Sequence, residues 1–125
     1  AGVDVTGWIR RRELLDRLSR SSLYVHSAAW EGAPLSVVEA ANLGVPVIGR
    51  DIAALRSIAL PNLFAEPRDA ALFVDEALRA GRMRSLREQS QAWGQAFSPG
   101  RQRDELMRAY VGVTSGRRRL DRAGT

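Results

Sequence analysis

Apolar residues recur at helical spacing near the start of the chain. Between residues 10 and 20, Leu14, Leu15 and Leu18 form one stripe, and charged side chains occupy the opposite side. This periodicity predicts an amphipathic helix of about three turns. Ahead of this helix, residues 1–8 resemble the end of a strand that enters a loop at Gly7.

Three short apolar runs predict strands. They cover residues 23–27, 45–49 and 62–64, and a compact, mostly apolar helix over 35–43 separates the first two. Between residues 50 and 58 we expect a loop that leads into a short helix. Short strands that alternate with helices predict an α/β fold, here a partial Rossmann-like parallel sheet with flanking helices.

The rest of the chain has a helical pattern. Apolar stripes predict helices over residues 69–80 and 83–97, and Ser98–Pro99 supplies a cap and first-turn proline for a further helix. We therefore expect a helical C-terminal end to a domain that covers 1–113. The remaining residues, 114–125, are polar and basic and predict a disordered tail.

The predicted sheet is thin for an α/β domain. Three or four short strands leave an exposed edge, which proteins normally cover. The chain also begins at Ala1 rather than at a methionine. We therefore expect a domain that is truncated on its N-terminal side.

Composition excludes several kinds of chemistry. The chain has no cysteine and a single histidine, His26, which rules out disulfides, thiolate chemistry and multi-histidine metal sites. All 19 basic residues are arginine, so no mechanism can use a lysine; this bias favours GC-rich codon usage and a bacterial source. No apolar run has the length of a membrane span. We expect a cytoplasmic protein, with contact at the inner face of the membrane left open as an alternative.

The segment around residue 30 has the features of an anion-binding turn. A predicted strand ends at Ser27, a loop turns through Glu31–Gly32, and a helix opens at Pro34 as its first position. Ligands of open α/β sheets bind outside the carboxyl ends of strands. The N–H groups at a helix N-terminus suit an anion such as a diphosphate, and Gly32 lets the backbone approach it closely.

Two carboxylates stand in this segment. Glu39 lies in an otherwise apolar helix, where a carboxylate must be paired or hydrogen-bonded, and Glu31 lies in the loop before that helix. A carboxylate has two acceptor oxygens that match the two O–H donors of a vicinal diol. The pair could therefore accept hydroxyl protons, one set from a sugar and the other from a ribose.

The order and spacing of these residues resemble a known signature. The segment 27–51 is similar to the donor-binding signature of GT-B-fold retaining glycosyltransferases of family 4, also called group 1. In that signature seven residues separate two glutamates, and a Gly-x-Pro-Val strand entry follows. The matching positions are Ser27, Trp30, Glu31–Gly32, Glu39–Ala40, Gly44–Val45–Pro46–Val47 and Asp51. The likeness extends more loosely over residues 3–80.

The resemblance implies a role for each position. Glu39 would bind the ribose hydroxyls of a nucleotide, and Glu31 would contact a hydroxyl of the transferred sugar. Backbone N–H groups of Gly32, Ala33 and Leu35 would face the sugar and diphosphate. The family implies a UDP- or GDP-sugar donor, transfer with retention, no cofactor and no required metal; it leaves the acceptor and any catalytic residue unassigned.

Further residues are weaker candidates. Arg50 and Arg56 follow the second predicted strand and are candidate phosphate contacts. His26 is more typical of a satisfied strand-end histidine than of a catalytic base. Trp30 is expected to pack, and Trp8 is a candidate for lining a cleft.

Two other functions stay open at this stage. The first is a catalytically inactive Rossmann-like remnant that acts as an interaction domain, because the chain departs from the family pattern at Ala33–Pro34 and Ser36. The second is a nucleic-acid-binding module, suggested by the net charge of +5 alone. The chain lacks a recognisable nucleic-acid-binding motif, so we expect no nucleic-acid partner.

Overall fold

The computed structural model describes the backbone of residues 2–122 and the side chains of residues 2–112. The chain forms two compact units, Ala1–Gln95 and Ala96–Thr125, which are described separately below. The first contains the sheet and five helices, and the second contains one helix.

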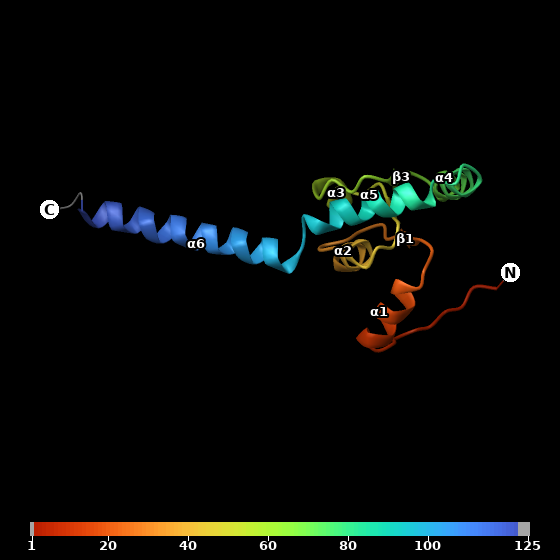
Figure 1. The fold of residues 1–125 in the computed structure, drawn as a ribbon, viewed down its shortest axis with the longest axis horizontal. Helices are drawn as coiled ribbons and strands as arrows, with labels where there is room; N and C mark the ends of the chain where they lie inside the picture. Colours follow the sequence, from red (N-terminus) through yellow and green to blue (C-terminus); the bar gives the residue numbers. More distant parts are fainter. Residues whose placement is uncertain (1, 123–125) are drawn as a thin grey trace. The chain divides into compact units, whose positions relative to one another are not determined.

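A three-stranded parallel sheet forms the centre of the first unit (Figure 1). Its strands are β1 (Tyr24–His26), β2 (Val47–Arg50) and β3 (Leu63–Phe64), in the order β1-β2-β3. Both neighbouring pairs are parallel, with Val25 opposite Ile48 in the first. The predicted α/β fold with a parallel sheet is confirmed. The second strand begins two residues later than predicted and extends to Arg50.

Helices connect and cover the strands much as the sequence predicts. The short helix expected between residues 50 and 58 is present, and the helix expected over 83–97 ends at residue 95. The helices of this unit are α1 (Arg11–Ser19), α2 (Leu35–Asn42), α3 (Ala53–Ser57), α4 (Pro67–Arg79) and α5 (Met83–Gln95).

Helix α4 begins two residues before its predicted start at 69. Pro67 occupies its first turn, where its missing N–H costs no hydrogen bond. The Asp69 carboxylate accepts the backbone N–H of Glu66 at 3.0 Å, which is half of a capping box. The predicted start was wrong because it relied on the apolar stripe, whereas the cap is made by polar residues ahead of that stripe.

The sheet lies between two layers of helices. Helix α4 covers one face, where Ile48 and Phe64 pack against Ala70. Helices α2, α3 and α5 cover the other face, and Leu18 of α1 joins the same cluster. The buried members of this larger cluster are Leu18, Val37, Ala40, Ala41, Val45, Val47, Leu55 and Leu60.

Close contact between α2 and α5 holds α2 in place. A Cβ added at Gly94 of α5 would lie 2.9 Å from the Cβ of Ala41, so only glycine permits this approach. Buried Ser90 accepts the backbone N–H of Val47 through its Oγ at 3.0 Å and so ties α5 to the start of β2. These contacts fix the helix that carries Glu39.

The residues before α1 form neither helix nor strand between positions 2 and 10, so the strand end expected before Gly7 is absent. The expected loop is present, and Gly7 has a φ of 61° that favours glycine. Within α1, Arg17 pairs with Glu13 at 3.0 Å. This hydrogen bond and the accompanying charge attraction raise the pKa of Arg17 above its ordinary value.

The second unit contains helix α6 (Pro99–Arg122). The Oγ of Ser98 accepts the N–H of Arg101 at 3.3 Å, as expected for the predicted cap. The helical backbone continues over residues 114–122 of the segment predicted as a tail, and residues 123–125 lie outside the described part. Among the described residues, no helix is both long and apolar enough to cross a lipid bilayer.

Candidate functional site

The carboxyl ends of the three strands share one edge of the sheet. The chain leaves β1 at His26, β2 at Arg50 and β3 at Phe64, and the strands are parallel. This is the edge at which open α/β sheets bind ligands. The segment 27–34 runs from the end of β1 to the start of α2 and contains Glu31.

Pro34 lies just outside α2 rather than at its first position, which corrects the prediction. It is the N-cap residue, with a φ of −78° and a ψ of 62°. Its carbonyl accepts the N–H groups of Val37 at 3.1 Å and Val38 at 3.3 Å. The helix therefore begins at Leu35, and the loop before it turns tightly, with the Leu35 N–H bonded to the Ala33 carbonyl at 2.8 Å.

The Glu31 carboxylate is held from two sides. Its Oε1 accepts the N–H of Gly32 at 2.9 Å. Its Oε2 lies 3.5 Å from Nε2 of His26, and the side chain is 27% exposed. The group is thus hydrogen-bonded to the loop backbone and lies beside the strand end, while it remains accessible to a ligand.

The Glu39 carboxylate forms an ion pair with Arg11. Its Oε1 lies 2.5 Å from Nη2 of Arg11, and the Glu39 side chain is 24% exposed. The prediction that Glu39 must have a partner is confirmed. The identity of that partner was missed, because Arg11 stands 28 positions away in a run of arginines and only the packing of α1 brings it to α2.

Of the three backbone N–H groups expected to bind the donor, two are already hydrogen-bonded within the loop. The N–H groups of Gly32 and Leu35 already bond within the loop, to Glu31 and to the Ala33 carbonyl. The N–H of Ala33 makes no hydrogen bond within the described part of the chain. A ligand at the start of α2 would therefore meet one free donor and would compete for the other two.

Arg50, which ends β2, and Arg56 of α3 are not brought to the glutamates. Arg56 pairs with Asp51 at 2.7 Å. Arg50 lines a cavity of about 340 Å³ together with Ser27, Glu66 and residues of α4. Successive strand residues point to opposite faces of a sheet, so Arg50 lies on the α4 face, away from α2. Their role as phosphate contacts stays a prediction.

The tryptophans differ in their surroundings. Trp93 packs against the larger core cluster and donates its Nε1–H to the Ile58 carbonyl at 2.9 Å. Trp30 is 84% exposed, so the expectation that it packs was wrong. Its ring lies next to Gly32 of the same loop, because a Cβ added at Gly32 would be 3.9 Å from the ring. Trp8 is fully exposed.

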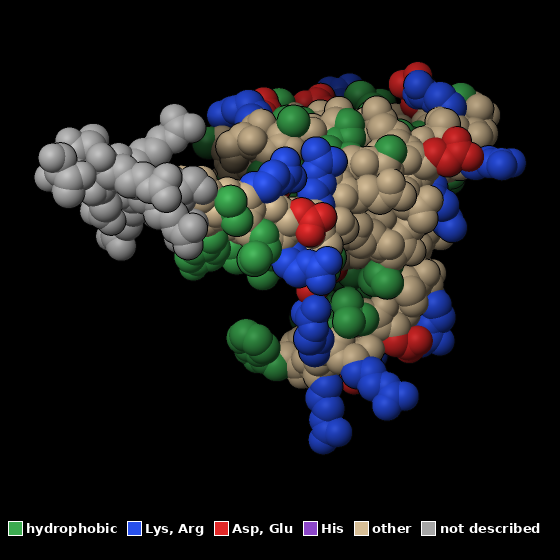
Figure 2. Space-filling view, turned by 60° about the vertical axis from the view of Figure 1, so that its left-hand side comes forward, with side chains coloured by type: hydrophobic (Ala, Val, Ile, Leu, Met, Phe, Trp, Pro, Cys, Tyr) green, Lys and Arg blue, Asp and Glu red, His purple; other side chains and the backbone are tan. Residues whose placement is uncertain are grey.

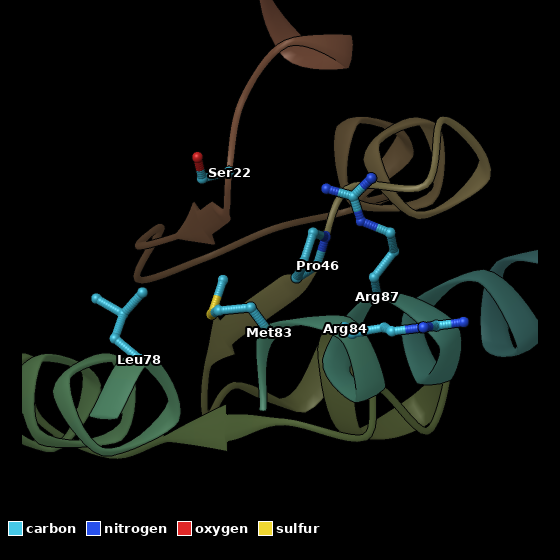
Figure 3. Close-up of a pocket in the computed structure, with 6 residues that line it drawn as sticks. All are labelled: Ser22, Pro46, Leu78, Met83, Arg84 and Arg87. Atoms are coloured by element: carbon cyan, nitrogen blue, oxygen red, sulfur yellow. The ribbon is translucent and has the colours of Figure 1, made fainter. Parts of the chain in front are cut away.

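A larger cavity, of about 550 Å³, lies at the opposite edge of the sheet (Figure 3). Ser22 and Pro46 line it just before β1 and β2 begin. Arg84 and Arg87 of α5 also line it, together with Leu78 and Met83. Its place at the amino ends of the strands separates it from the Glu31 and Glu39 pair.

Charge is spread over the surface. On the face that Figure 2 presents, arginine side chains lie among acidic ones and do not form one continuous patch. Eight of the arginine–carboxylate pairs in the described region join charges on the same helix or within six positions, as between Arg79 and Asp75 or Arg82 and Glu76. In the same region, no three side chains of His, Cys, Asp or Glu gather as a metal site.

Residues 1–96 match the family model described as "Glycosyl transferases group 1". The chain belongs to this family. The matched region contains both glutamates and the whole segment 27–51, and it ends beside the boundary of the first compact unit at residue 95. No protein with a curated description matches the chain.

Membership of the group 1 glycosyl transferases supports glycosyl transfer as the general function. It implies a glycosyl donor and an acceptor as partners. It does not favour the alternative of a remnant that serves only as an interaction domain.

Proposed function

We propose that this group 1 glycosyl transferase binds the nucleotide-sugar donor for retaining transfer at the start of α2. The observation that carries the proposal is the placement of Glu31 and Glu39. Both side chains are about one quarter exposed, and both belong to the loop and helix at the carboxyl edge of the sheet.

Glu39 is proposed to bind the ribose of the donor. It lies four residues into α2, about 6 Å along the helix axis at about 1.5 Å per residue. A ribose diol offers two O–H donors to the two oxygens of the carboxylate. Its ion pair with Arg11 engages Oε1 and leaves Oε2 to accept from the diol.

Glu31 is proposed to accept a hydroxyl of the transferred sugar. The backbone N–H groups of Gly32, Ala33 and Leu35 would then face the sugar and diphosphate at the positive end of α2. The free N–H of Ala33 supports this placement. Arg50 and Arg56 stay candidate phosphate contacts, for which the donor would have to draw Arg56 from Asp51.

The proposed donor is a UDP- or GDP-sugar, bound without a cofactor or a required metal. Retention, the nucleotide type and the absence of a metal rest on the family resemblance of the segment 27–51. Each glutamate is assigned to a different part of the donor, Glu39 to the nucleotide and Glu31 to the sugar.

Substitution of Glu39 tests this proposal. Glu39→Ala should weaken the binding of UDP or GDP at least tenfold, because a hydrogen bond to a charged group contributes about 1.5–3 kcal/mol. Isothermal titration calorimetry of the protein with each nucleotide measures the effect. The matched control is Glu76→Ala, which removes an exposed, ion-paired glutamate of α4.

The control variant should bind as the unmodified protein does. Equal nucleotide affinity for Glu39→Ala and Glu76→Ala would overturn the assignment of Glu39. Failure of the unmodified protein to bind either nucleotide would overturn the proposal of a donor site.

A further inference from the structure

We propose that His26 is a positioning residue that orients the Glu31 carboxylate toward the sugar of the donor. The inference rests on the proposed function, since it takes Glu31 as the group that contacts the sugar. It assigns to the only histidine of the chain a role that acts through Glu31 and not through contact with the donor.

The first support is the burial of His26. The residue ends β1 and is 7% exposed. Its Nε2 is buried and has no hydrogen-bond partner among the described residues at the distance required for a hydrogen bond. A buried, unsatisfied ring nitrogen costs free energy, about 1–3 kcal/mol, so such an atom needs a partner. The nearest acidic group is Glu31, whose Oε2 lies 3.5 Å away.

The second support is the environment of the other ring nitrogen. Nδ1 of His26 lies 3.3 Å from the Tyr24 hydroxyl, which in turn is hydrogen-bonded to the Ser36 hydroxyl at 2.9 Å. As placed, the Tyr24 hydroxyl donates to Ser36. A hydroxyl proton can rotate, so in the alternative arrangement Ser36 donates and the Tyr24 proton is free for Nδ1. A neutral imidazole that accepts at Nδ1 carries its proton on Nε2, which faces Glu31.

The resulting chain of groups joins three elements of the fold. Ser36 lies in the first turn of α2, Tyr24 and His26 lie on the same face of β1, and Glu31 lies in the loop between them. The chain of contacts therefore couples the loop to the strand and to the helix that carries Glu39. Movement of Glu31 would break a contact with a buried partner.

The consequence for Glu31 is that both oxygens are held. Gly32 donates to Oε1 at 2.9 Å, and Nε2 of His26 lies 3.5 Å from Oε2. A carboxylate accepts about four hydrogen bonds, so about two acceptor positions stay available. Because the side chain is 27% exposed, those positions can receive hydroxyl protons of a sugar.

A double-mutant cycle on the protein tests the proposal. UDP-glucose and GDP-mannose serve as sugar-bearing probes, and UDP and GDP serve as the matched probes without a sugar. His26→Leu should weaken binding of the sugar-bearing probe at least fivefold relative to the bare nucleotide, as should Glu31→Ala. Because His26 acts through Glu31, adding His26→Leu to Glu31→Ala should change the affinity less than twofold.

Two further variants separate positioning from loss of packing. His26→Gln places an amide donor near the position of Nε2 and should restore most of the selective affinity for the sugar-bearing probe. Tyr24→Phe keeps the ring and removes the hydroxyl that lies 3.3 Å from Nδ1, so it should lower that affinity by a smaller factor. Bare-nucleotide affinity should stay within twofold in both variants, which a loss of folding would not allow.

The outcomes distinguish the two proposals. Full additivity of His26→Leu and Glu31→Ala, or no effect of His26→Leu beside a clear effect of Glu31→Ala, would overturn the role of His26. Absence of any effect of Glu31→Ala would also overturn the role of His26. The proposal of a donor site would still stand in that case if Glu39→Ala weakens nucleotide binding. Absence of nucleotide binding by the unmodified protein would overturn both proposals.

Discussion

At the scale of single residues, the chemistry of the site follows from a few side chains and their partners. The spacing of Glu31 and Glu39 predicts the pair of carboxylates, and the apolar surroundings of Glu39 predict that it needs a partner. Neither feature of the sequence predicts that Arg11 pairs with Glu39 or that His26 lies beside Glu31. Both contacts depend on which elements pack side by side, and a local pattern holds no information about that.

Ser90 supports a prediction about stability at this scale. Ser90→Ala would leave the N–H of Val47 buried without its acceptor, which should lower the free energy of unfolding by about 1–3 kcal/mol. Urea unfolding followed by circular dichroism measures the change. The control is Ser85→Ala, an exposed serine of the same helix, for which we expect a change within about 0.5 kcal/mol.

A loss in Ser90→Ala no larger than in Ser85→Ala would contradict the importance of this hydrogen bond. The sequence predicts Ser90 on the apolar stripe of its helix but does not predict the hydrogen bond. Its acceptor role exists only because α5 lies against the start of β2.

At the scale of elements, apolar runs predict the three strands and apolar stripes predict the longer helices of the first unit, with boundaries that differ by one or two residues. The differences occur where polar groups or backbone geometry decide the boundary. Glu66 and Asp69 start α4 early, and Pro34 caps α2 from outside. The second unit differs more, because α6 continues over residues predicted as a tail.

Gly94 supports a prediction at the scale of element packing. Alanine normally favours a helix over glycine by about 1 kcal/mol. At position 94, however, the added methyl group would meet Ala41 at 2.9 Å and force α5 away from α2. We expect Gly94→Ala to destabilise the protein by about 1–3 kcal/mol in urea unfolding.

Gly112→Ala is the matched control for helix propensity. A Cβ at Gly112 of α6 meets nothing within 4 Å, so this substitution carries only the gain in propensity and should not lower stability. Increased stability of Gly94→Ala would show that the α2–α5 contact can relax, and would contradict the tight placement of α2 described above.

At the scale of the whole molecule, the compact unit and the family match coincide. The first unit spans Ala1–Gln95, and the model of the group 1 glycosyl transferases matches residues 1–96. Every buried member of the two core clusters lies within this unit. The fold class and the place of the segment 27–34 at the carboxyl edge of the sheet could be predicted from the sequence, because parallel strands that alternate with helices all end at the same edge.

The two edges of the sheet offer different places for a ligand. The cavity with Arg84 and Arg87 lies at the amino edge, whereas Glu31 and Glu39 lie at the carboxyl edge. The polarity of parallel strands favours the carboxyl edge. From the sequence, the two edges can be told apart only by the predicted direction of the strands.

Mapping of backbone amide chemical shifts tests the central claim most directly. The nitrogen-15-labelled protein is titrated with UDP and with GDP, and the shift of each amide is followed. We predict that one nucleotide moves the amides of residues 31–39 most, with Ala33 and Glu39 among them, and leaves those of Ser22, Arg84 and Arg87 unmoved. Shifts centred on Ser22, Arg84 and Arg87, or no shifts with either nucleotide, would contradict a donor site at the start of α2.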